Sequence, residues 1–159
     1  MKLLYRGSRD GTTSKEFHEK CDNECPTIVL YKNEKNNIFG GYTKFLWSSP
    51  SNETYYPDKN SFLFTLTNIY DIEPTKFPIL NSDRSIRHQK NRGPTFGGNP
   101  SKYGNPDLGV YSDYKEENCY SGFPESYKDI TGKGYSIFTG LKDNNHFKVK
   151  EIEVFKIFN

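Results

Sequence analysis

Residues 147–157 constrain the fold of this chain most, because apolar and charged side chains alternate there with a period of two. That period is typical of a β-strand, in which successive side chains point to opposite faces of the sheet. An unbroken strand would place Glu151 and Glu153 within an apolar row that also contains Phe147, Val149, Phe155 and Ile157. Buried carboxylates are costly unless they are paired. The pattern therefore predicts either a bulge near Lys150 that turns both glutamates outward, or buried glutamates that meet arginines from residues 6–9 or 84–92.

The composition favours a β fold over a helical bundle. The chain has 159 residues, enough for a core of its own, and we expect a single domain over residues 1–159. Alanine is absent, and aromatic residues make up 16% of the chain against 33% for all hydrophobic residues together. Aromatic side chains suit strands, and the 13 Gly and 9 Pro residues supply turns.

One helix is predicted near the N-terminus, and strands are predicted over the rest of the chain. Thr13 and Glu16 form a capping box, and the helix should end before Cys25-Pro26 because proline disfavours a helical residue ahead of it. In the second predicted strand, Gly40-Gly41 indicates a bulge or a close backbone approach. Alternation and flanking turn residues predict strands at 27–32, 38–46, 61–67, 85–89, 108–111, 135–139 and 147–157. This order predicts a mainly β fold with few helices, arranged as a two-sheet antiparallel β-sandwich.

The charge pattern gives little reason to expect a nucleic-acid partner. The formal net charge is +2, with lysine and arginine scattered among the acidic residues. A nucleic-acid groove needs clustered basic side chains interleaved with aromatic ones. The one local candidate comprises Arg84, Arg87, His88, Lys90 and Arg92. Because charged runs in linkers usually face water, we interpret it as a solvated basic loop and expect no nucleic-acid binding.

No metal site is predicted. His18, Cys21 and Cys25 lie near one another, but a closed zinc site needs four ligands in recognisable pairs, and no second pair is present. A second set of possible ligands is acidic and comprises Asp107, Asp113, Glu116, Glu117 and Asp129. The spacing of this set matches no EF-hand loop.

No cofactor is predicted either. Residues 93–100 are rich in glycine, which raises the possibility of a phosphate-binding loop. Such loops lead into a helix or carry a Gly-Lys-Ser/Thr triplet, whereas Pro100 and Pro106 follow here. A tight turn before a strand is the simpler interpretation.

The cysteines favour a reducing environment. Their odd number and irregular spacing, and the lack of an apolar leading segment, predict a cytoplasmic setting without direct membrane insertion. Cys119 is a candidate redox thiol, which would need an exposed thiolate of low pKa. Its acidic neighbours Glu116 and Glu117 would raise that pKa, so an ordinary small side chain is the favoured interpretation.

Several segments in order resemble the TLDc domain family of oxidation-resistance proteins. The closing segment Phe147–Phe155 is similar to the end of that family's domain. The other matching segments are Leu3–Gly11, Phe17-His18, Pro26-Thr27, Ile38–Tyr42, Trp47-Ser48, Ser61–Phe64 and Gly97-Gly98. The chain departs from the family pattern at Val110, where many members carry Trp, and at residues 99–106, which look inserted. It also departs at Lys115-Glu116-Glu117, which makes the following loop more acidic.

The resemblance implies a β-sandwich flanked by short helices and a role that is not catalytic. The family is linked to resistance against oxidative damage and to binding and regulating the vacuolar-type proton ATPase. A protein partner, such as a subunit of that ATPase, is therefore expected for a monomeric domain that carries no cofactor and no catalytic residues. Within the matching motifs, Arg9, Asp10, Glu151 and Glu153 are the candidate partner-binding residues.

An enzyme is the alternative, with Glu151 and Glu153 as acid and base or Cys119 as a redox group. Residues two apart on a strand lie about 7 Å from each other and point the same way, which would suit a substrate placed across both carboxylates. Their pKa values would have to be pushed apart for hydrolytic chemistry. No Ser-His-Asp or Cys-His arrangement can be recognised in the sequence, and a fold alone supplies no chemistry. The binding domain is therefore the favoured hypothesis.

Overall fold

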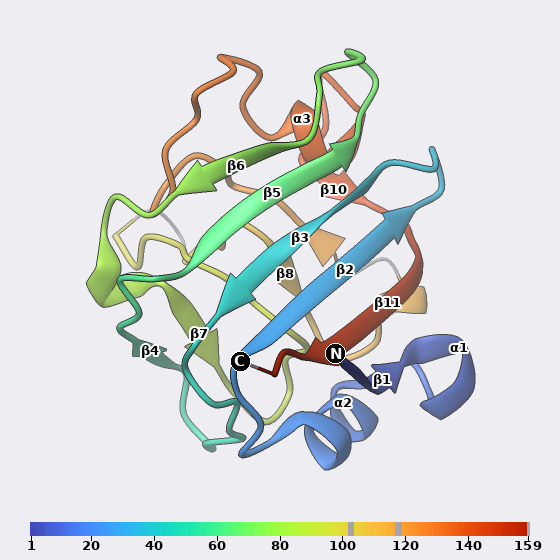
Figure 1. Cartoon of the computed structure of the whole chain (residues 1–159), viewed down its shortest axis with the longest axis vertical. Coiled ribbons are helices and arrows are strands. Elements are labelled where there is room, and N and C mark those ends of the chain that lie inside the picture. Colours follow the sequence, from blue (N-terminus) through green and yellow to red (C-terminus); the bar gives the residue numbers. More distant parts are fainter. Residues whose placement is uncertain (102–103, 117–118, 159) are drawn as a thin grey trace.

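A six-stranded antiparallel sheet forms one layer of the fold in the computed structural model, which describes residues 1–101, 104–116 and 119–158. Its strand order is β1-β11-β2-β3-β5-β6, so the first and last strands of the chain lie side by side (Figure 1). The bounds are Lys2–Arg6 for β1, Val149–Lys156 for β11, Thr27–Asn33 for β2, Ile38–Thr43 for β3, Phe62–Thr67 for β5 and Thr75–Pro78 for β6.

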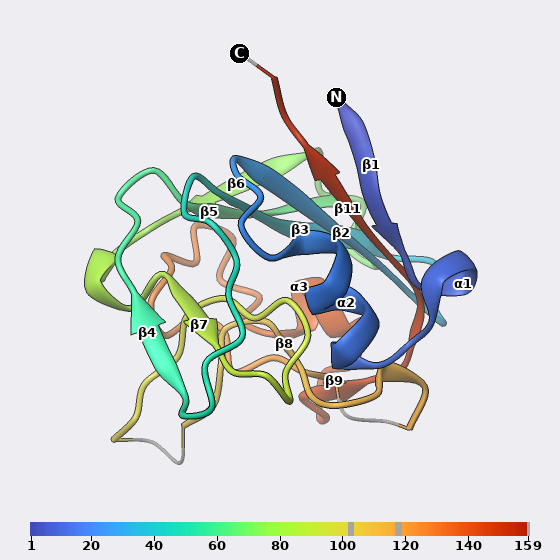
Figure 2. The same ribbon diagram turned by 90° about the horizontal axis from the view of Figure 1, so that it is seen from below.

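Shorter strands form the second layer, which lies below the large sheet in Figure 2. Three of them pair in the order β10-β9-β8, with bounds His146–Phe147, Cys119–Tyr120 and Gly109–Val110. A separate pair consists of β4 (Thr54–Tyr56) and β7 (Ile86–His88). Phe96 forms bridges to both Ile86 and Leu108 and thereby links these two small sheets. The predicted mainly β antiparallel sandwich is confirmed.

Short helices flank the sandwich. The α1 helix (Gly7–Asp10) and the α2 helix (Ser14–Cys21) lie beside the edge strand β1 (Figures 1 and 2). The predicted capping box at Thr13 and Glu16 is confirmed, and α2 buries Phe17 and Cys21. The described residues also form two 3-10 turns, η1 (Ser82–Arg84) and η2 (Tyr114–Glu116), and the α3 helix (Ser136–Thr139). Within the described ranges, no helix has the length and apolar character needed to cross a membrane.

The strand predicted at residues 135–139 is wrong, because Ser136–Thr139 forms the α3 helix. Its adjacent residues Ile137 and Phe138 are both fully buried, whereas a strand would direct them to opposite faces. Gly140 ends the helix in the left-handed conformation with φ of 70°, a common helix stop.

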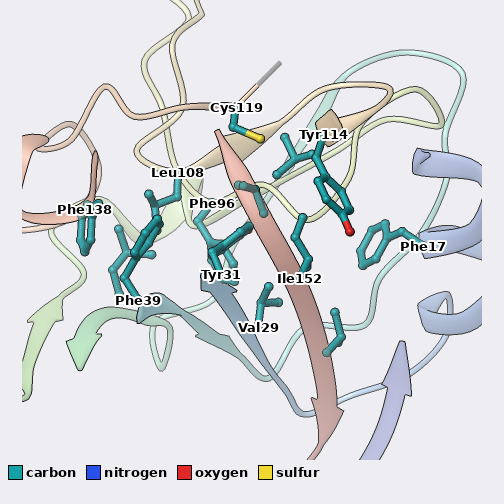
Figure 3. Packing of buried hydrophobic residues seen from close by; sticks show 14 of the residues in the cluster. Phe17, Val29, Tyr31, Phe39, Phe96, Leu108, Tyr114, Cys119, Phe138 and Ile152 are labelled. Atoms are coloured by element: carbon teal, nitrogen blue, oxygen red, sulfur yellow. The ribbon is translucent and has the colours of Figure 1, made fainter. Parts of the chain in front are cut away.

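The core between the layers is largely aromatic (Figure 3). The Phe39 ring packs against Tyr31, Phe138 and Phe147, with ring centroids 5.4–5.6 Å apart. Gly41 permits the layers to approach closely, because a Cβ atom there would lie 2.6 Å from the ring of Phe96. The close approach predicted for the Gly40-Gly41 pair is therefore present.

The last strand bulges, which is one of the two alternatives that the sequence left open. The pairing of β11 with β2 shifts register between Val149 and Glu151, and the extra residue, Lys150, is exposed. Val149 before the bulge and Ile152 after it both face the core. The bulge turns Glu151 and Glu153 to the outer face of the sheet. The alternative of buried glutamates is excluded.

Candidate functional site

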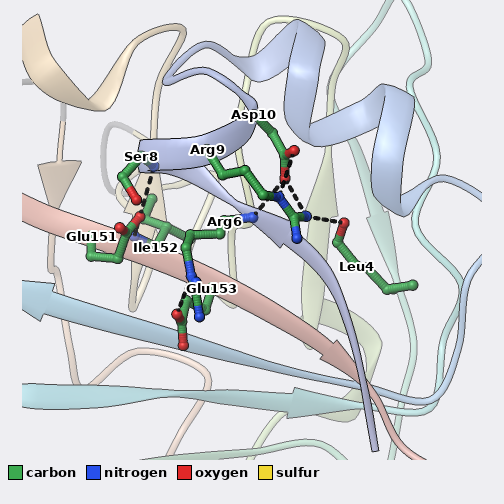
Figure 4. Close-up of polar contacts among 8 residues, drawn as sticks. All are labelled: Leu4, Arg6, Ser8, Arg9, Asp10, Glu151, Ile152 and Glu153. Carbon is green, nitrogen blue, oxygen red and sulfur yellow. Dashed lines mark hydrogen bonds and ion pairs between the residues drawn. The ribbon is translucent and has the colours of Figure 1, made fainter.

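The candidate partner-binding residues come together where β1 and α1 meet β11 (Figure 4). Both ends of the chain contribute, because β1 and β11 pair antiparallel with Arg6 opposite Glu153. We call the group formed by Arg6, Arg9, Asp10, Glu151 and Glu153 the edge cluster. All four residues named from the sequence belong to it.

Glu153 forms an ion pair with Arg6. The Arg6 Nε atom lies 2.6 Å from Glu153 Oε1, and the two side chains are 43% and 23% exposed. The strand register and the shared outer face bring these two side chains together. Ion pairs that water reaches in this way contribute about 0–1 kcal/mol to folding. The pair therefore orients the carboxylate more than it stabilises the domain.

Glu151 holds the start of α1 against β11. Its Oε1 atom accepts a hydrogen bond of 3.0 Å from the backbone N–H of Ser8. The first N–H groups of a helix have no partner within the helix, so a carboxylate here satisfies one of them. Glu151 thus has a structural contact and a half-buried position.

Arg9 and Asp10 cover the open edge of β1. Their side chains pair through contacts of 2.9 and 2.7 Å. Asp10 also accepts the Arg6 backbone N–H at 2.9 Å, and Arg9 donates to the Leu4 carbonyl at 3.3 Å. The Arg9 side chain and the Arg6 N–H hold the pKa of Asp10 at about 2, well below its ordinary value. The ion pair therefore occupies main-chain groups with which a further strand would pair.

The edge cluster offers charged oxygen and nitrogen atoms on a rigid scaffold. Its two arginines and three carboxylates sum to a formal charge of −1. The family-like motifs in the sequence contain Glu151, Glu153, Arg9 and Asp10. The contacts of Arg6 and Ser8 could not be predicted, because they depend on the β1–β11 register. Such a surface suits recognition of a partner that carries complementary charges.

The geometry gives no support to acid–base catalysis by Glu151 and Glu153. Each carboxylate already binds a group from β1 or α1. A cavity of about 520 Å³ lies beside the β2–β3 turn and β10, and one of about 560 Å³ lies beside α2, and neither glutamate lines them. Neither of these two cavities could therefore present a substrate to the pair.

Cys119 lacks the properties that a redox thiol requires. Its side chain is fully buried in the core (Figure 3), and burial raises the pKa of the thiol, with a further contribution from Asp113. Glu116 lies within the described chain, whereas Glu117, its other acidic neighbour, lies outside the described residues. The ordinary interpretation, a small core side chain, agrees with this burial.

A serine, an aspartate and a histidine do meet beside α2, but in an unsuitable order. Ser49 Oγ donates to Asp22 Oδ2 at 2.7 Å, and Asp22 Oδ1 lies 2.7 Å from His18 Nδ1. His18 Nε2 faces the carbonyl oxygens of Gln89 and Arg92. In a hydrolytic triad the histidine lies between serine and aspartate, so this chain of contacts activates no nucleophile.

The interpretation of residues 84–92 as a solvated basic loop is wrong. Arg87, His88 and Arg92 are buried, while Lys90 is exposed. The buried residues lie on β7 or in the loop that follows it. Composition does not predict that this segment forms a buried strand of the second layer. They present no basic groove at the surface.

His, Cys, Asp and Glu side chains in the described ranges form no group of three or more that could hold a metal ion. The predicted acidic set includes Glu117, which falls outside these ranges. Cys21 is buried in the core on the inner face of α2.

Comparison with known proteins identifies a family. The family model described as the TLDc domain matches residues 1–158. A search of curated proteins returned no match.

Proposed function

The chain belongs to the TLDc domain family, and on this premise we propose that it is a non-catalytic protein-interaction domain. We propose further that it acts in resistance to oxidative stress and binds or regulates the vacuolar-type proton ATPase. In this proposal it works in the cytoplasm as a monomer. The observation that carries the proposal is the edge cluster, which combines residues from both ends of the chain at the surface of the large sheet.

The state of the candidate catalytic groups supports binding rather than chemistry. Glu151 and Glu153 are held by Ser8 and Arg6, and Cys119 is buried with a raised pKa. Rigid charged groups of this kind favour specific docking, because a partner finds them already oriented.

A binding measurement with purified components tests the proposal. The domain is immobilised, and separately purified soluble subunits of the vacuolar-type proton ATPase are passed over it. We expect saturable binding of at least one subunit at low salt, and weaker binding as salt rises, because exposed charges are screened. Absence of binding by every subunit and by the assembled soluble sector would contradict this partner.

A heat-unfolded sample of the same domain provides the control for non-specific capture. Subunits that bind both samples equally do not count as partners. The oxidative-stress part is tested separately, by asking whether cells that lack the protein lose survival under peroxide and regain it with the unmodified chain. Unchanged survival would contradict that part alone.

A further inference from the structure

Two buried arginines meet one carboxylate beside β7. Arg87, on β7, is 2% exposed, and Arg92, in the loop that follows, is 9% exposed. Both contact the carboxylate of Glu53, which directly precedes β4. The Arg87 Nε atom lies 3.0 Å from Oε1, and the Arg92 Nη2 atom lies 2.9 Å from Oε2. Two guanidinium groups thus share one carboxylate.

The remaining contacts of the two arginines are neutral. Arg87 Nη1 donates to the Tyr55 hydroxyl at 3.2 Å and to the carbonyl of Gly104. The guanidinium of Arg92 lies over the ring of Tyr111, 4.1 Å from its centroid. Hydroxyl, carbonyl and ring orient the cations without neutralising them. In these contacts two guanidinium groups have one carboxylate between them, so one positive charge has no negative partner. Such an unpaired charge is costly where water has little access.

Two hydrogen-bond donors of Arg92 are also left over. Its Nε and Nη1 atoms are buried and have no partner within the described chain. Native proteins rarely leave such donors unsatisfied, and an ion or ordered water is a common explanation. The excess charge favours an anion over water.

The backbone packs closely against the other arginine. Gly98 and Gly104 both lie against the Arg87 guanidinium, where a Cβ atom would come within 3.1 and 3.5 Å of its nitrogens. Glu53 is the outermost member of the group, with a side chain that is 31% exposed. An anion from solvent would therefore meet the Glu53 carboxylate first.

We propose that Arg87 and Arg92 form a binding site for a small oxyanion, a phosphate or a carboxylate, and that Glu53 fills half of it in the free chain. The planar fork of arginine matches both kinds of oxyanion through paired N–H donors. A singly charged oxyanion at the free donors of Arg92 balances the charge beside Glu53. A doubly charged phosphate takes the whole site when Glu53 turns outward.

Titrations of the full chain with sodium phosphate, sodium acetate and sodium chloride at equal ionic strength test this proposal. Calorimetry or amide chemical shifts report the dissociation constants. Phosphate also stabilises proteins by exclusion from their surface, so the decisive comparison is between variants. Arg92→Gln removes one site cation, and Arg84→Gln, on η1, removes the same charge outside the site.

We expect phosphate or acetate to bind the unmodified chain more tightly than chloride does. Arg92→Gln should weaken this binding at least about tenfold, whereas Arg84→Gln should change it less than about twofold. Tighter binding of phosphate or of acetate identifies which oxyanion the site prefers. Equal weakening by the two substitutions would overturn the proposal, because it would show a general charge effect.

Glu53→Gln gives an independent test if loss of Arg92 unfolds the domain. Removal of the resident carboxylate frees both arginines, so the affinity for phosphate should rise about tenfold or more. The proposal is overturned if neither phosphate nor acetate binds this variant more tightly than chloride.

Discussion

Arg6 and Glu153 face each other across the first and last strands of the chain, with Nε and Oε1 2.6 Å apart. Their contact holds the two termini together at the same place where Glu151 meets Ser8 of α1. The pair is partly exposed, so its charges remain accessible to a partner. The proposed binding role is based on this combination of a fixed geometry and partly exposed charges.

The first prediction concerns the energy of this pair. Arg6→Gln, Glu153→Gln and the double variant form a double-mutant cycle in urea unfolding. Because water screens the pair, we expect a coupling energy of about 0.2–1 kcal/mol. A coupling above about 2 kcal/mol would show that the pair mainly stabilises the fold.

The second prediction concerns the edge of the large sheet. Replacement of Arg9 and Asp10 together by alanine exposes the Leu4 carbonyl and the Arg6 N–H of β1. Open edge strands pair with one another, so we expect more self-association in light scattering than for the unmodified chain. The Lys15→Ala, Glu19→Ala variant removes a matched exposed ion pair on α2 as a control. Equal association of both variants would contradict the protective role.

The third prediction concerns acid stability. Burial, with a smaller effect of His18, lowers the pKa of His88 to about 3 from 6.5. Below pH 6.5 the His88 imidazole therefore binds a proton in the unfolded chain but stays neutral in the folded chain. The free energy of unfolding decreases as the pH falls from 6.5 towards 3. The loss amounts to about 1.4 kcal/mol per pH unit within this window.

His88→Phe should remove that contribution. Relative to the unmodified chain, its free energy of unfolding should improve steadily from pH 6 to pH 4 in urea titrations. His146→Phe, at an exposed position, is the matched control. A pH-independent difference between the His88 variant and the unmodified chain would contradict the assigned neutral state of His88.

The fourth prediction concerns the contact between the layers. A methyl group at Gly41 would lie 2.6 Å from the Phe96 ring, so Gly41→Ala should cost about 1–3 kcal/mol. Addition of Phe96→Leu should recover part of that loss, because the smaller side chain leaves space. Strictly additive losses in urea unfolding would contradict direct crowding.

Short sequence patterns indicated those structural features that depend mainly on residues close together in the chain. The capping box at Thr13 and Glu16 defined α2. The interrupted alternation around Lys150 reduced the possibilities for β11 to a bulge or buried glutamates, and the strand bulges. Gly40-Gly41 indicated the close approach that Phe96 makes. In each case the residues that determine the structure are neighbours in sequence or belong to one repeating pattern.

The remaining features depend on contacts between distant segments. Residues 136–139 resemble a strand, yet burial of both Ile137 and Phe138 favours a helical turn. Arg87 and Arg92 look like surface residues until Glu53 is placed beside them by the pairing of β4 with β7. The edge cluster likewise needs the β1–β11 register, which no local pattern encodes.

The affinity of a Glu151→Gln, Glu153→Gln double variant for the soluble ATPase subunits tests the central claim most directly. The control, Glu19→Gln with Glu73→Gln, removes the same charge at exposed positions elsewhere. We expect at least about tenfold weaker binding for the first variant and less than about twofold change for the second. Melting temperatures should stay close to that of the unmodified chain, since a glutamine oxygen still accepts the Ser8 N–H. Undiminished binding by a folded Glu151→Gln, Glu153→Gln variant would contradict a binding role for the edge cluster.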